Sequence, residues 1–76
     1  MISNTRVFTV VGFTVKGSQI DSLGGRREVI AQDVRDAAYD YRQDQGSFFH
    51  YAVTYADEHN SVGCVIVSDA WVMRDR

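Results

Sequence analysis

The stretch SFFHYAVTYA, at residues 47–56, decides the fold, because aromatic and β-branched side chains dominate it and predict a strand. The stretch VGCVIV, at residues 62–67, has the same character and predicts a second strand. The polar residues 57–60 between them predict a turn. Two strands this close in sequence pair most readily as an antiparallel hairpin.

One helix is predicted upstream of the hairpin, at residues 26–45. Glycines at 24–25 break the chain before it, and Gly46 follows it where a left-handed C-terminal cap is expected. The helix presents an apolar stripe at helical spacing, formed by Ile30, Val34, Ala37, Ala38 and Tyr41.

A further strand is predicted at residues 5–16, TRVFTVVGFTVK. The tripeptide Phe-Thr-Val occurs twice in it, beginning at Phe8 and again at Phe13. In a regular strand this spacing places the two phenylalanines on opposite faces. We favour a β-bulge at 11–12, which would put both of them on one face together with Val10 and Val15.

The order of these elements predicts an α+β fold of the β(β)αββ type. A turn at 17–18 leads into a short return strand at 19–23. We expect a two-layer sandwich, in which the helix packs on one face of a mainly antiparallel sheet. The 76 residues and 8.6 kDa predict a single domain, 1–76, which should expose about 4,700 Å² by the size scaling of folded proteins.

One helix covers only one face of such a sheet, so the other face must contact water or another chain. That uncovered face carries more apolar surface than a small single domain usually exposes, which predicts a homodimer. Phe48 and Trp71 are its candidate partner-binding residues. The alternative is that sheet twist and the C-terminal tail cover most of it. We expect the helix side to hold Phe49, Tyr51, Val53, Tyr55, Val62, Cys64 and Ile66. The uncovered side would carry Val7, Phe48, Ala52, Val65 and Val67, with Trp71 near its edge.

Charge and composition argue against several classes of protein. Eight basic and ten acidic residues give a net charge of −2 and a pI of about 5.5, so direct nucleic-acid binding is not expected. No apolar run is long enough to predict a membrane span, and we expect no signal peptide. The single cysteine, Cys64, forms no internal disulfide, which favours a reducing compartment and a cytoplasmic location.

Catalytic, metal and cofactor sites are not predicted. His50, His59 and Cys64 occur in no nucleophile–base signature, and VGCVIV is typical of a buried strand with cysteine as a small apolar residue. The acidic and histidine side chains at 57–59 lack the spacing of metal motifs, so we expect a solvated turn there. A non-enzymatic protein without metal or cofactor is therefore expected.

Four aspartates of the predicted helix fall within an arc of about 80°, and we call them the acidic row. Such a row can imitate a run of phosphates or contact a basic groove, so its members are candidate partner-binding residues. The alternative is a solvated face that aids solubility. Arg35 and Arg42 are expected on the far side of the helix. The acidic row consists of Asp33, Asp36, Asp40 and Asp44.

The segment GGRR at 24–27 is the best hint of a small ligand. At a helix start, free backbone N–H groups and the positive end of the dipole attract anions, and Arg26 and Arg27 would reinforce this. The complete phosphate-binding fingerprints are absent, and paired glycines also serve as a flexible connection.

Together these features favour a small protein-binding module over an enzyme. A small, acidic, aromatic-rich chain without a catalytic set is similar in kind to phage or mobile-element proteins that block a host machine. The leading hypothesis is an inhibitor of a host nucleic-acid enzyme or defence complex, acting through the acidic row and the apolar sheet face. The alternative is an oligomeric small-molecule binder for a nucleotide or flavin, using Arg26 and Arg27.

Overall fold

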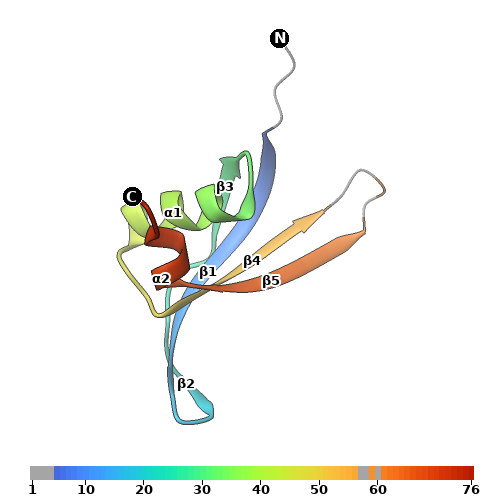
Figure 1. Cartoon of the computed structure of the whole chain (residues 1–76). Coiled ribbons are helices and arrows are strands. Elements are labelled where there is room, and N and C mark those ends of the chain that lie inside the picture. Colours follow the sequence, from blue (N-terminus) through green and yellow to red (C-terminus); the bar gives the residue numbers. More distant parts are fainter. Residues whose placement is uncertain (1–4, 57–58, 60) are drawn as a thin grey trace.

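The computed structural model describes residues 5–56, 59 and 61–76, and it confirms the α+β fold (Figure 1). Five antiparallel strands form one sheet, and one main helix packs against it. The elements are β1 (Arg6–Lys16), β2 (Gln19–Leu23), β3 (Arg27–Ala31), α1 (Val34–Gln45), β4 (His50–Ala56), β5 (Val62–Ser68) and α2 (Asp69–Met73).

The long strand β1 organises the sheet, whose strand order is β2-β1-β4-β5. One side of β1 pairs with β4, while β3 and β2 pair in succession with the first and last parts of its other side. Gly24 lies in the connection between β2 and β3. Its N–H donates to the carbonyl of Gly12 at 2.8 Å, which holds this connection against β1. The predicted turn at 17–18 and return strand at 19–23 are both present, and Gly17 has a φ of 64°.

The core lies between the sheet and the two helices, which occupy the same side of the sheet (Figure 1). We call this side the inner face. Short side chains of α1 allow it to approach the strands closely, and Tyr41 extends from it over β4. The buried apolar side chains of the described residues are those of Phe8, Val10 and Ala31 of β1 and β3, Ala37, Ala38 and Tyr41 of α1, Tyr51 and Val53 of β4, and Val72 of α2.

The predicted start of the helix at residue 26 is wrong, because residues 27–31 form β3 and α1 begins at Val34. Pairing with β1 determines the conformation of this segment, and tertiary pairing outweighs its local helical pattern. The carboxylate of Asp33 caps α1 by accepting a hydrogen bond from the Asp36 N–H at 2.8 Å. Gly46 ends the helix with a φ of 94°, a conformation that favours glycine.

The predicted bulge at 11–12 is also wrong. The register between β1 and β4 is continuous from the Phe8–Tyr55 pair to the Phe13–His50 pair, so the two phenylalanines lie on opposite faces. The irregularity lies instead in the pairing of β1 with β2, next to Thr14. Gly12 serves a different purpose: a Cβ there would collide with the Phe48 ring on the inner face.

The hairpin prediction is correct for β4 and reversed for β5. Tyr51 and Val53 are buried on the inner face as expected, whereas Phe49 precedes the strand and is 62% exposed. In β5 the inner set is Gly63, Val65 and Val67, and the predicted inner set of Val62, Cys64 and Ile66 is exposed. The polar turn predicted at 57–60 involves residues 57, 58 and 60, which lie outside the described residues.

The chain after β5 forms a second, short helix, α2. Ser68 caps α2, its hydroxyl accepting a hydrogen bond from the Trp71 N–H at 3.2 Å. Val72 is fully buried, whereas Trp71 is 40% exposed. Within the described part of the chain, neither helix is long and apolar enough to cross a membrane.

Candidate protein-interaction surface

The face of the sheet turned away from the helices, here called the outer face, is built from alternate residues of every strand. Residues paired across neighbouring strands point to the same side, so the registers assign its members. On β1 they are Val7, Thr9, Val11, Phe13 and Val15. On the other strands they are Ile20, Leu23, Glu28, Ile30, His50, Ala52, Thr54, Ala56, Val62, Cys64, Ile66 and Ser68.

The outer face is strongly apolar and almost free of charge. Among the described residues that the registers place on it, Glu28 is the one member of the Asp, Glu, Lys and Arg group. Folded monomers rarely expose a contiguous apolar surface of this extent, so it is the main candidate for a contact surface. Six large apolar side chains on it are 54% to 72% exposed, namely Val7, Ile20, Leu23, Ile30, Val62 and Ile66.

Cys64 and His50 both lie on the outer face, but they do not form a catalytic pair. Cys64 stands opposite Thr54, and His50 stands four residues further along β4, a separation of about 13 Å. The His50 ring stacks on Phe13, with 5.5 Å between ring centroids and 21° between planes. Cys64 is exposed, which corrects the prediction that it is a small apolar residue of a buried strand on the helix side.

Phe48 and Trp71, the candidate partner-binding residues expected on the uncovered side, both lie on the inner side of the sheet instead. The Phe48 ring packs against Tyr41 and Tyr51, with centroid distances of 6.0 and 6.3 Å. Trp71 belongs to α2, and the Arg35 guanidinium lies 5.6 Å from its ring centroid. Neither residue contributes to the outer face.

Two aspartates of the acidic row have structural contacts within the chain, and the other two are solvent-exposed. Asp33 caps α1, and Asp36 accepts from Arg76 Nη2 at 2.9 Å, tying the C-terminus to the helix. Asp40 is exposed, and Asp44 is exposed with its Oδ2 2.6 Å from Gln45 Nε2. The row lies on α1, in the layer opposite the outer face.

Arg35 and Arg42, expected on the side of the helix far from the acidic row, contact α2 and the residues after it. The Arg35 guanidinium donates to the carbonyls of Trp71 and Arg74, at 3.2 Å to Trp71. Arg42 Nε donates to Asp69 Oδ1 at 2.9 Å. These arginines therefore hold the second helix in place.

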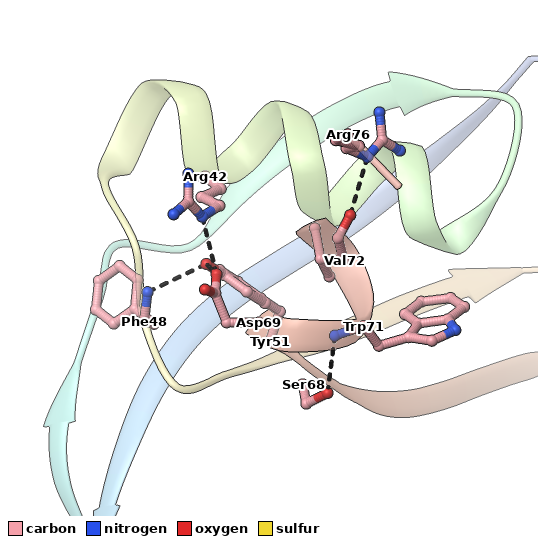
Figure 2. Close-up of polar contacts among 8 residues, drawn as sticks. All are labelled: Arg42, Phe48, Tyr51, Ser68, Asp69, Trp71, Val72 and Arg76. Atoms are coloured by element: carbon pink, nitrogen blue, oxygen red, sulfur yellow. Dashed lines mark hydrogen bonds and ion pairs between the residues drawn. The ribbon is translucent and has the colours of Figure 1, made fainter. Parts of the chain in front are cut away.

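A polar cluster joins α1, β4 and α2 at Tyr51 (Figure 2). The Tyr51 hydroxyl donates to Asp69 Oδ1 at 2.5 Å and accepts from the Phe48 N–H at 3.1 Å. Burial, reinforced by the hydrogen bond to Asp69, raises the pKa of Tyr51 to about 12. The hydrogen bond to Asp69 also raises the pKa of Arg42. The phenol is thus neutral at ordinary pH, and the cluster acts as a structural clamp.

The GGRR segment does not lie at a helix start, because it connects β2 to β3. Arg27 Nη1 donates to the carbonyl of Arg26 at 3.0 Å. The start of α1 borders a depression of about 310 Å³, which is also lined by Arg6 and Tyr55. At this helix end the carboxylate of Asp33 already accepts a hydrogen bond from the Asp36 N–H. The anion-binding geometry on which the ligand hypothesis depends is therefore absent from 24–27.

Sequence reasoning missed most of the outer face. The signal was present in β1, where Val11, Phe13 and Val15 alternate with period two, and the assumed bulge concealed it.

Across the described ranges, no group of three or more His, Cys, Asp or Glu side chains could hold a metal ion. Comparisons with protein-family models, with curated proteins and with solved structures found no match.

Proposed function

We propose that this chain is a non-enzymatic protein-binding module whose principal contact surface is the outer face. The observation that carries the proposal is the set of six large apolar side chains exposed on a nearly uncharged sheet. Burial of apolar surface contributes about 25 cal/mol per Å², so a protein partner that covers this face gains substantial free energy.

The chemistry of the outer face favours protein over the other classes of partner. Nucleic acids and anionic membrane surfaces are held by lysine and arginine, and the registers place neither on this face among the described residues. Small ligands require a concave site with converging polar groups, whereas this surface is one side of a sheet. The nucleotide or flavin alternative has also lost the helix end on which Arg26 and Arg27 were expected to act.

The finer proposal is an inhibitor that presents carboxylates to the basic groove of a host nucleic-acid enzyme. It is supported by Asp40 and Asp44, which are exposed, whereas Asp33 and Asp36 have contacts inside the chain. The single thiol of the sequence supports a cytoplasmic setting for such a protein.

Site-specific photo-crosslinking in producing cells tests the main proposal. A photoreactive residue at Ile30 or Ile66 should give a defined covalent adduct with protein, because both side chains are more than 60% exposed on the outer face. The matched control is Gln43, which is exposed on α1. Equal adducts from all three positions, or none from Ile30 and Ile66, would contradict the proposal.

A further inference from the structure

We infer that the occupant of the outer face is a second copy of this chain, an inference that rests on the proposed function. Two outer faces would pack against each other about a two-fold axis, which places the helices on the outside of a four-layer dimer. Sheets that pack in this way lie about 10 Å apart with strands crossing at roughly −30°.

The first support is the exposed area of the single chain. It exposes 5385 Å², whereas a folded monomer of 8.6 kDa is expected to expose about 4,700 Å². The difference is about 700 Å², and each partner in a standard stable interface buries about 800 Å². Six of the eight large apolar side chains that are exposed among the described residues lie on the outer face, so this face contributes to the surplus.

The second support is the near absence of charge. A two-fold interface brings the same surface patch of both copies together, so any charge near the axis meets its own equivalent. Among the described residues assigned to the outer face, Glu28 is the one acidic side chain, and it lies on β3 at the margin of the sheet. The apolar and threonine side chains of β1 and β4 form a centre that can contact a copy of itself without repulsion.

A second dimer geometry must be separated from this one. Within the described residues β5 pairs with β4 alone, and its seven residues carry no charge, so its free edge could pair with the β5 of another copy. Ile66 lies on β5 and would be near either contact. Ile30 lies on β3, across the sheet from β5, and is buried only by face-to-face packing.

Sedimentation velocity on the purified chain and three single variants provides the test. The unmodified chain should sediment at micromolar concentration with about twice the mass of 8.6 kDa. Ile30→Lys and Ile66→Lys should each weaken dimerisation at least about thirtyfold, because each would bury an unpaired ammonium. Phe49→Lys is the control, since Phe49 is 62% exposed, precedes β4 and undergoes the same change of charge. It should change the dissociation constant less than about threefold.

Thiol labelling of the unmodified chain adds a measurement that depends on no variant. Cys64 is exposed in the single chain but would be covered in the face-to-face dimer, so its labelling rate should fall as protein concentration rises through the dissociation constant. A rate independent of concentration would overturn the inference.

Other outcomes overturn the inference in distinguishable ways. A dimer that Ile66→Lys dissociates and Ile30→Lys leaves intact would be paired through the β5 edge. A monomeric chain whose outer face crosslinks to a different protein would preserve the proposed function and exclude the second copy. A monomer that gives no adduct from the outer face would contradict both.

Discussion

The Tyr51 hydroxyl and the Asp69 carboxylate, joined by a 2.5 Å hydrogen bond, connect the sheet to the C-terminal helix. The same Asp69 oxygen accepts from Arg42 Nε, so β4, α1 and α2 meet at one carboxylate (Figure 2). Because Val72 of α2 belongs to the core, these hydrogen bonds also keep α2 packed on the apolar interior.

Tyr51→Phe should lower the free energy of unfolding by about 1–3 kcal/mol. The change removes the bond to Asp69 and leaves the Phe48 N–H without its acceptor in a partly buried position. Urea unfolding followed by circular dichroism measures the loss. Tyr39→Phe is the control, because Tyr39 contributes its ring face to Arg76, which phenylalanine retains. Equal losses in the two variants would show that the clamp adds no stability.

The raised pKa of Tyr51 predicts a loss of stability in alkaline solution. Its pKa is about 12 in the folded chain against 10.0 for an ordinary tyrosine, so the folded state holds this proton more tightly. The resulting stabilisation is complete below pH 10 and is lost as the pH rises from 10 towards 12. Urea midpoints across this range should fall less steeply in Tyr51→Phe than in the unmodified chain. Parallel curves would contradict the assigned pKa.

Asp33→Ala should cost about 1 kcal/mol of stability, because it removes the carboxylate that caps α1. Asp33→Asn should restore most of the loss, since asparagine is an equally good cap. Asp40→Ala, in the same row but exposed, should change stability by less than about 0.5 kcal/mol. Chemical denaturation of the three variants separates a capping role from a general effect of negative charge on the helix.

Gly12→Ala should destabilise the chain by about 1–3 kcal/mol through overpacking. The new methyl group would collide with Phe48 and lie 2.9 Å from Tyr41 Cε1. Adding Phe48→Leu should relieve part of this strain, so the double variant should lose less stability than the sum of the single variants. Strict additivity in a thermodynamic cycle would show that the space over Gly12 is not filled as described.

The central hairpin could be predicted from the sequence because its signals are local. The run of aromatic and β-branched residues in β4 specifies both a strand and its buried side, since Tyr51 and Val53 alternate with smaller residues. In β5 both alternating sets are apolar, so hydrophobicity cannot choose between them. Gly63 determines which set faces the helices. A Cβ there would lie 2.8 Å from Tyr55 Cζ, and glycine leaves room for that ring on the inner face.

The segment 27–31 shows why the helix boundary could not be predicted from its pattern. Arg27-Glu28-Val29-Ile30-Ala31 fits an amphipathic helix and a strand about equally well, and pairing with a distant part of the chain decides between them. The best local signal was Asp33, a strong capping residue placed directly before Val34. The composition of the candidate surface depends on which alternate residues of β1 and β5 face outward: the alternation in β1 indicated its outer set, whereas β5 is apolar on both sides and indicated none.

The pairing of β1 with β4 also has consequences for folding kinetics. β2 and β3 pair with β1, and β5 pairs with β4, so these contacts form within two short, separate parts of the chain. The β1–β4 pairing alone joins those parts, and its closure carries the largest loop entropy. We therefore expect this docking step to limit the folding rate, so that truncating Val10 or Val53 slows folding, whereas truncating Val65, which packs on the core from β5, mainly speeds unfolding.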